Sequence, residues 1–509
     1  MSTETGQAPR AAERLRKVSL DKDLHKLERV EEATRSLSRS LLAPGLALAF
    51  LAVSAVVAGV QIGAQPNALV LIAASVLAGY MALNIGANDV ANNVGPAVGS
   101  RALTMTGALI IAAIFECAGA LIAGGEVVNT ISKGIIDPSM VGSSEVFIAT
   151  MMAALIASAV WVNVATYVGA PVSTTHAVVG GVVGAGIAAA GFGIANWHVL
   201  AAIAASWVVS PLLGGIIAAL FLAFIKANII YRHDKIAAAR LWVPALIAIM
   251  CSAFTAYLMM KGLSRIWKTS AMVVALVSGG VLVGSFLLLR PLIRRQSAHM
   301  ENRNQSLRKL FHLPLICSAA LLSFAHGAND VANAVGPLAG ILHSSASGSV
   351  AGKVALPFWI MIIGAAGISI GLFLFGPTLI RTVGQEITRM NPVRAFCVSL
   401  SAAITVIVAS ALGLPVSSTH IAVGAVFGVG FFREYYTSRS RRRRDYMASK
   451  GARASKRREP ALAEQQYLMR RKLVRRSHFT VVVAAWVITV PVAAVLAAVI
   501  FRVFVLLGI

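Results

Sequence analysis

The 509-residue sequence has few charged side chains, since only 13% of its residues are Asp, Glu, Lys or Arg. Hydrophobic residues make up 57%, and the mean hydropathy is +0.78. Soluble domains carry about 25% charged residues, so this composition excludes an ordinary soluble protein. Apolar stretches of 18 or more residues recur along the chain. Each is long enough to cross a hydrocarbon core of about 30 Å as a helix, which predicts an all-α polytopic membrane protein.

Cysteine is also scarce, and Cys117, Cys251, Cys317 and Cys397 are far apart. They have neither metal-site nor disulfide spacing, so we interpret them as small buried hydrophobic residues. The sequence contains no P-loop and no dinucleotide fingerprint, which argues against a pump driven by its own ATPase domain. It contains no recognisable set of nucleophile, base and orienting residue either. We therefore expect no enzyme, no cofactor and no resident metal.

Acidic residues are outnumbered, with 20 acids against 45 basic residues and a net charge of +25. Residues 433–477 hold 16 Lys or Arg against four acids, and residues 290–311 hold six against one. Basic clusters between apolar spans are typical of cytoplasmic loops, and they attract anionic lipid headgroups. We therefore expect anionic lipid, and not nucleic acid, as the partner of these segments.

One polar motif interrupts the apolar pattern twice. The sequence Gly-Ala-Asn-Asp-Val-Ala-Asn occupies residues 86–92 and returns at 327–333, and 11 of 16 positions agree between residues 84–99 and 325–340. The copies are followed by Gly95-Pro96 and Gly336-Pro337. Proline removes a backbone N–H, so we predict a helix broken inside the membrane at this motif. Its freed backbone groups would need partners in protein, water or a ligand, because lipid offers none.

A second motif, rich in hydroxyl groups, is also duplicated. Residues 169–186 and 413–430 agree at 11 of 18 positions, and each copy places three hydroxyl residues after a proline. The proline predicts a break, with the hydroxyl residues at the start of a new half-helix. Such a helix start suits a tetrahedral oxyanion, because hydroxyl and backbone N–H groups donate to several oxygens while the helix dipole favours negative charge. The alternative is a structural role in capping or joining helices. The hydroxyl residues are Ser173, Thr174, Thr175, Ser417, Ser418 and Thr419.

The order and spacing of the two motifs are kept in both copies. The first motif recurs after 241 residues and the second after 244, which predicts a duplicated transport unit. The first motif falls in the second predicted segment and its copy in the ninth. Because this separation is odd, we predict inverted repeats, as in many secondary transporters. We expect about 11 to 13 membrane segments, including re-entrant hairpins.

The acids inside apolar stretches need a reason to be there. Asp89 and Asp330 would repel an anion, so we predict that they bind coupling cations or accept a hydrogen bond from a protonated oxyanion. Carboxamide oxygens would assist them, or the same side chains would only join helices; these residues are Asn88, Asn92, Asn329 and Asn333. Glu116 lies within an apolar span, where a charge costs at least ~2.5 kcal/mol, so we expect it to face a cavity or a partner unless the span ends before it.

His176 and His420 each follow the hydroxyl residues of their motif directly. A histidine in this position has an ordinary pKa near neutrality and could carry a proton. We favour the alternative, in which each ring is a satisfied structural residue.

The paired motifs resemble the inorganic phosphate transporter family of the PiT type, over nearly all of residues 45–432 and the last span. The resemblance implies two inverted repeats that import inorganic phosphate across a bacterial inner membrane by symport with Na⁺ or H⁺. It implies a phosphate site formed by Asp89, Asn92, Ser173, Thr174, Thr175, Asp330, Asn333, Ser417, Ser418 and Thr419. Glu116 matches a family glutamate, and the coupling-ion candidates are Asn88, Asp89, Glu116, Asn329 and Asp330.

One departure from the family concerns the coupling ion. Many sodium-coupled members have a second glutamate where this sequence has Ser399, and this loss makes proton coupling more plausible. The resemblance leaves sulfate or thiosulfate as an alternative substrate. An anion channel or a transporter-derived receptor is the alternative from another class. We also expect that phosphate could bind as a metal complex and that the protein could form a homodimer.

These observations predict six parts of the chain. The first 40 residues are charged and lack a secretory signal, which indicates a cytoplasmic arm. The parts are the N-terminal arm (1–40), a first transport repeat (41–225), central spans with basic connections (226–311), a second transport repeat (312–432), a basic cytoplasmic loop (433–477) and a last transmembrane helix (478–509).

Overall fold

The computed structural model describes residues 41–65, 67–137, 140–170, 172–262, 269–347, 356–386, 390–439 and 476–508. The chain forms two compact units, Met1–Phe50 and Leu51–Ile509, and the site lies in the second. Every regular element in the described residues is a helix, apart from one isolated bridge between Ile136 and Ala195. The all-α prediction is confirmed. The predicted N-terminal arm and most of the basic loop lie outside the described residues.

Ten helices in the described ranges are long and apolar enough to cross a membrane. Two shorter apolar helices, α7 (Thr174–Ala190) and α13 (Phe358–Leu374), accompany them. The expected 11 to 13 segments and the inversion of the repeats stay predictions. The ten spans are Leu41–Ile62, Ala68–Gly99 (α3), Met105–Ala123 (α4), Ser144–Tyr167 (α6), Trp197–Ile230 (α8 and η4), Lys235–Gly262 (α9 and η5), Ala271–Gln296 (α10), His312–Ala346 (within α12, His312–Ser347), Pro392–Ala411 (α15) and Val487–Leu507 (within α19, Arg476–Leu507).

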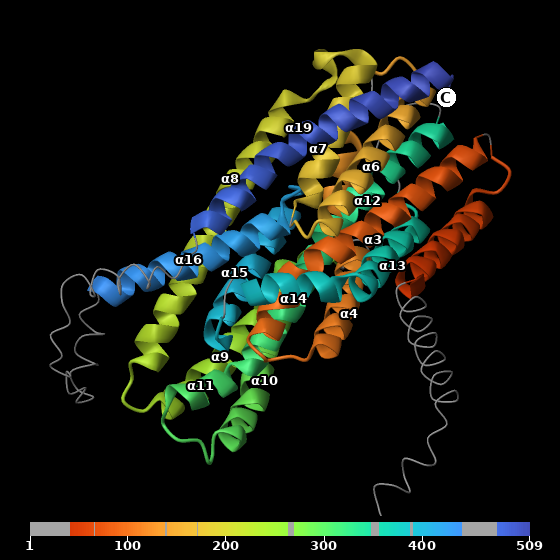
Figure 1. The fold of residues 1–509 in the computed structure, drawn as a ribbon. Coiled ribbons are helices and arrows are strands. Elements are labelled where there is room, and N and C mark those ends of the chain that lie inside the picture. The colour runs from red at the N-terminus through yellow and green to blue at the C-terminus, as the bar shows by residue number, and fades with distance from the viewer. Residues whose placement is uncertain are drawn as a thin grey trace, which may run out of the picture. The chain divides into compact units, whose positions relative to one another are not determined.

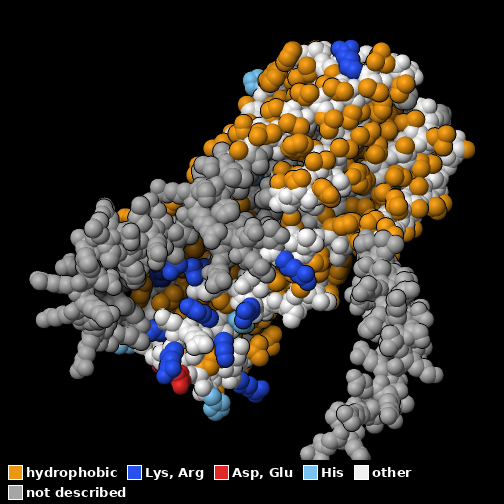
Figure 2. Space-filling model, in the orientation of Figure 1, with side chains coloured by type: hydrophobic (Ala, Val, Ile, Leu, Met, Phe, Trp, Pro, Cys, Tyr) orange, Lys and Arg blue, Asp and Glu red, His pale blue; other side chains and the backbone are white. Residues whose placement is uncertain are grey.

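The surface of the second unit divides by polarity. Hydrophobic side chains cover the face over α19, α7 and α13, whereas Lys and Arg gather near α9, α10 and α11 (Asn304–Leu310) (Figure 2). In α10, Leu276 and Leu288 are 67% and 75% exposed, which would be costly in water. A bilayer around these apolar side chains removes that cost, so the surface agrees with the predicted membrane protein.

The chain breaks at the hydroxyl motifs, as predicted. The helix α6 ends at Tyr167 and α7 begins at Thr174, while α15 ends at Ala411 and α16 (Ser418–Arg439) begins at Ser418. The predicted break at the Gly-Ala-Asn-Asp motifs is wrong, because α3 and α12 continue through them with Pro96 and Pro337 inside. Each proline lacks one backbone N–H and therefore removes one helical hydrogen bond, but the helix continues past it in both copies.

Helices of the two halves pack against one another reciprocally. The helix α3 contacts α13, and its copy α12 contacts α4; likewise α7 contacts α19, and its copy α16 contacts α8 (Figure 1). Gly86 of α3 and Gly327 of α12 make two equivalent crossings, because a Cβ at either position would run into a carbonyl of the facing helix, at Ile368 and Glu116 respectively. The motif glycines therefore allow the site helices to approach their neighbours backbone to backbone.

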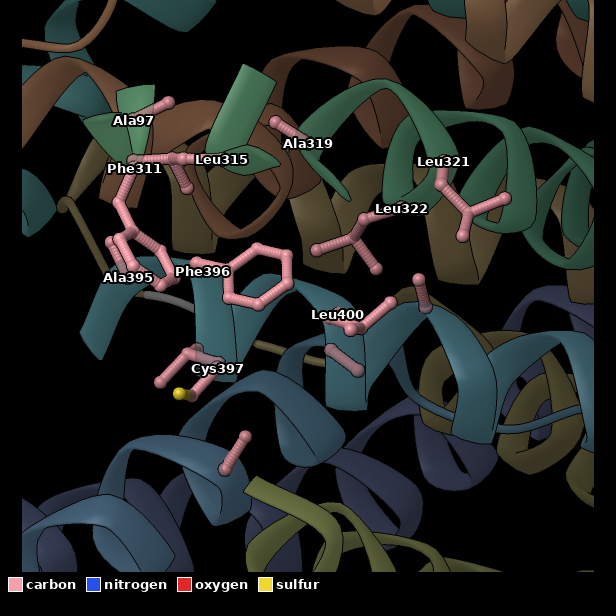
Figure 3. Close-up of a cluster of buried hydrophobic side chains, with 14 of the residues drawn as sticks. Ala97, Phe311, Leu315, Ala319, Leu321, Leu322, Ala395, Phe396, Cys397 and Leu400 are labelled. Atoms are coloured by element: carbon pink, nitrogen blue, oxygen red, sulfur yellow. The ribbon is translucent and has the colours of Figure 1, made fainter. Parts of the chain in front are cut away.

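A hydrophobic cluster fixes α12 against α15 (Figure 3). The rings of Phe311 and Phe396 lie 5.7 Å apart, edge to face, and Leu315, Leu322 and Leu400 are at most 4% exposed. Aromatic pairs of this geometry contribute about 0.5–1.5 kcal/mol beyond their burial. This packing positions the second Asp-bearing helix beside the helix that leads into the second hydroxyl motif.

Candidate functional site

The starts of α7 and α16 form one side of the buried site. The Ser173 hydroxyl accepts a hydrogen bond from the His176 backbone N–H (3.1 Å), and the Ser417 hydroxyl accepts one from the His420 N–H (3.3 Å). Each serine thus caps its helix, in agreement with the structural alternative for these two residues. Capping fixes the direction in which the following threonine and serine hydroxyls point.

Asp89 accepts hydrogen bonds from both halves of the chain. Its Oδ2 accepts from Thr174 Oγ1 (3.0 Å), and its Oδ1 accepts from Thr419 Oγ1 (2.9 Å). Asn92 Nδ2 donates to Thr419 Oγ1 (2.8 Å). These side chains are at most 9% exposed. The first Asp-bearing helix therefore meets its own hydroxyl motif and the copy of that motif.

Asp330 has the corresponding place in the second half. Its Oδ2 accepts a hydrogen bond from Ser418 Oγ (3.2 Å), the counterpart of Thr174. Asn333 Nδ2 donates to Thr175 Oγ1 (3.1 Å), and Thr175 Oγ1 donates to the Val416 carbonyl (3.0 Å). The structure thus brings together the ten residues predicted for phosphate, with the two serines as caps.

Asn88 and Asn329 are directed toward neighbouring helix ends. Asn88 Nδ2 donates to Thr166 Oγ1 (2.9 Å) near the end of α6. Asn329 Nδ2 donates to Ser410 Oγ (2.9 Å), and its Oδ1 accepts from the Val416 N–H (3.3 Å). Both carboxamides therefore join helices, as the structural alternative expected. A coupling-ion role for either residue stays a prediction.

Glu116 faces two polar partners that the sequence analysis missed. Asn93 Nδ2 donates to Glu116 Oε1 (2.7 Å), and His326 Nδ1 lies 3.4 Å from the same oxygen. Glu116 and His326 are each 0% exposed, so the glutamate does not reach the membrane surface. The expectation of a buried partner for Glu116 is confirmed. The signal for these partners was a difference between the motif copies. The first copy has Ile85 where the second has His326, and the second has Ala334 where the first has Asn93.

His326 also approaches both aspartates. Its Nε2 lies 3.0 Å from Asp330 Oδ2 and 3.7 Å from Asp89 Oδ2. One ligating atom from each of Asp89, His326 and Asp330 falls within 4.8 Å of the others, and this is the group in the described residues that is close enough to hold a metal ion. The distances from His326 to the two aspartates are also those of ion pairs. A charged His326 can therefore compensate the aspartate charges without a metal.

His176 and His420 pack against each other behind the hydroxyl residues. Their rings lie 4.4 Å apart, edge to face, and the Trp207 ring lies 3.7 Å from His176. The Trp207 indole N–H donates to the Pro415 carbonyl (3.2 Å), which connects α8 to the second hydroxyl motif. These contacts agree with the favoured structural role of both histidines.

Ser399 is fully buried in α15, and its hydroxyl has no hydrogen-bond partner among the described residues. The position therefore provides no carboxylate at membrane depth. A coupling ion that needed a glutamate here would find a hydroxyl oxygen instead.

The fold and the site together define a class of protein. Hydroxyl groups at two helix starts meet two carboxylates deep among apolar membrane-length helices, as expected of a membrane transport protein with a buried oxyanion site. A sequence model described as "Phosphate transporter family" matches residues 85–497. The chain belongs to this phosphate transporter family.

Individual relatives agree with this assignment. The chain is 46% identical to a Helicobacter pylori protein named "Putative phosphate permease", over 94% of this chain and 98% of the relative. It is 34% identical to a protein named in the same way from Pyrococcus horikoshii, over 84% of this chain and 96% of the relative. A solved structure named "The sodium-dependent phosphate transporter" is similar with a TM-score of 0.75 and 32% identity, and it covers 86% of this chain and 99% of its own.

Proposed function

We propose that this protein imports inorganic phosphate across a bacterial inner membrane by symport with Na⁺ or H⁺. The observation that supports the proposal is the meeting of both hydroxyl motifs with both aspartates in one buried site. The hydroxyls of Thr174, Ser418 and Thr419 can turn from the carboxylates to phosphate oxygens, and the starts of α7 and α16 favour negative charge. A carboxylate released in this way accepts a hydrogen bond from a protonated phosphate oxygen.

Coupling to a cation follows from charge. Asp89 and Asp330 are each 1% exposed, so a third negative charge beside them needs compensation. The solved relative is named as sodium-dependent, which supports Na⁺ as the coupling ion. Ser399, in place of the glutamate of many sodium-coupled members, favours H⁺. We therefore keep both ions, and a gradient experiment separates them.

The test is uptake of radiolabelled phosphate by purified protein in proteoliposomes, with Na⁺ and pH gradients imposed separately. We expect saturable uptake that follows one of the two gradients and that excess sulfate does not inhibit. Uptake that is indifferent to both gradients would contradict symport. Inhibition by sulfate would favour the sulfate alternative, and unsaturable flux would favour a channel.

A parallel series with and without Mg²⁺ or Mn²⁺ tests the form of the substrate. If phosphate crosses as a metal complex, labelled metal and labelled phosphate enter together in a constant ratio. If free phosphate is the substrate, phosphate uptake is the same after chelation of the metal.

A further inference from the structure

The crossing of α3 with α13 and the crossing of α12 with α4 have the same backbone geometry but different side chains. A Cβ at Gly86 would meet the Ile368 carbonyl, and a Cβ at Gly327 would meet the Glu116 carbonyl. One turn further along, a Cβ at Gly371 would meet Leu83, and a Cβ at Gly119 would meet Phe324. Since 83 and 86 are equivalent to 324 and 327 in the motif repeat, Glu116 is the structural counterpart of Ile368.

Three polar residues at one crossing therefore have apolar counterparts at the other. His326 corresponds to Ile85, Asn93 to Ala334 and Glu116 to Ile368. The polar three contact one another, with Asn93 bonded to Glu116 and His326 beside it. Ile85, Ala334 and Ile368 are each 0% exposed and belong to one hydrophobic cluster.

His326 lies among three carboxylates and is itself fully buried. Within 4 Å of its ring nitrogens are Glu116 of α4, Asp89 of α3 and Asp330 of its own helix α12, one turn away. Burial disfavours the charged form of an imidazole, whereas attraction to several nearby negative charges favours it. A buried carboxylate group without a compensating charge would be strongly unfavourable. No other ionisable side chain of the described residues makes an ion pair with these three acids.

We propose that His326 is a fixed internal cation that compensates Asp330, and that Glu116 holds and partly offsets that charge. His326 then determines the concentration of coupling cation that is needed for phosphate to bind. The inference rests on the proposed phosphate symport. Asp330 has its compensating charge built in at 3.0 Å, whereas Asp89, at 3.7 Å, depends more on the mobile coupling cation.

Loss of charge at His326 and loss of charge at Glu116 should change the requirement for coupling cation in opposite directions. Without the charge of His326, both aspartates need mobile cations, so phosphate binding requires more of the coupling cation. Without the charge of Glu116, the positive charge of His326 acts more strongly on the aspartates and the phosphate. Phosphate binding then requires less of the coupling cation. A purely structural role of the pair would shift both variants in the same direction, through loss of folding.

The experiment measures phosphate binding to purified full-length protein as a function of the coupling cation identified by uptake. For His326→Gln, we expect the cation concentration at half-maximal binding to rise roughly tenfold, within the usual range for coupled sites. For Glu116→Gln, we expect it to fall by about the same factor. His326→Lys keeps a positive charge and should shift the concentration less than His326→Gln does. Ile85→Val, at the apolar counterpart, is the matched control and should leave the concentration unchanged.

The outcomes separate the inference from the proposed function. If the wild type binds no phosphate with either cation, the proposed function fails. If the wild type binds phosphate but both Gln variants shift in the same direction or not at all, only the inference fails. If His326→Gln does not fold, the direction of the Glu116→Gln shift still decides. Tight binding of Zn²⁺ or Mn²⁺ by the wild type that His326→Gln abolishes would make His326 a metal ligand and overturn the inference.

Discussion

The two Asp-bearing motifs have nearly the same sequence but different surroundings. Asp89 accepts hydrogen bonds from two threonine hydroxyls, one from each half. Asp330 accepts a hydrogen bond from one serine hydroxyl and lies beside His326. Thr419 donates to Asp89, but its counterpart Thr175 donates to the Val416 carbonyl. The duplicated motifs therefore form two similar scaffolds, in which one aspartate accepts two hydroxyl hydrogen bonds and the other lies closer to a histidine.

The largest effect should come from the aspartates themselves. Asp89→Asn and Asp330→Asn should each lower concentrative phosphate uptake by at least about 30-fold, because loss of a buried charge from such a network costs about 2–5 kcal/mol. Proteoliposome uptake measures the loss, with the amount of inserted protein determined in parallel. Glu145→Gln, which removes an acid in the first turn of α6, is the control. Near-normal uptake by either Asn variant would remove that aspartate from the site.

The glycine crossings test whether the two scaffolds are equivalent. Gly86→Ala and Gly327→Ala should each destabilise the protein by about 1–3 kcal/mol, because the added methyl group meets the facing backbone. Thermal unfolding of the purified protein measures this effect. A Cβ at Gly279 of α10 meets nothing within 4 Å, so Gly279→Ala should not destabilise. If only one of the two motif variants were destabilised, the crossings would not be equivalent.

The threonine pair tests the difference between the sites. Thr419→Val removes a donor to Asp89 and a partner of Asn92, so we expect about tenfold weaker phosphate binding, since an unsatisfied buried group costs about 1–3 kcal/mol. Thr175→Val should weaken binding less, because that hydroxyl donates to a backbone carbonyl. Thr419→Ser keeps the hydroxyl and serves as the control. Equal losses in the two Val variants would mean that phosphate, and not Asp89, is the main partner of both threonines.

Much of the candidate site could be predicted from the sequence, because the repeated motifs contain most of the residues that the structure brings together there. The half-helix starts at Thr174 and Ser418 followed from the hydroxyl residues and the proline, and their structure confirms them. The break expected at Pro96 and Pro337 was wrong, because each proline removes only one backbone hydrogen bond and the polar side chains of the motifs find partners on neighbouring helices without a break. His326 was missed because it occurs in only one copy of the motif, where the other copy has Ile85. Its partners Glu116 and Asp89 are more than 200 residues away in the sequence, and only the fold brings them together.

The smallest effect should come from the basic loop. Residues 440–470, which lie outside the described residues, contain 10 Lys or Arg that the sequence assigns to the cytoplasmic face. The hydrogen bonds and ion pairs described for the site come from α3, α4, α7, α12 and α16 with their flanking residues, and from α6, α8 and α15. Deletion of 440–470 should therefore leave uptake within about twofold of wild type, since surface changes away from a site usually alter free energies by about 0.5 kcal/mol or less. Uptake should be compared in liposomes with and without anionic lipid, because the predicted partner of the loop is the lipid headgroup. Complete loss of uptake by a correctly inserted deletion variant would make the loop part of the transport mechanism, and the comparison between the two halves would then have to include it.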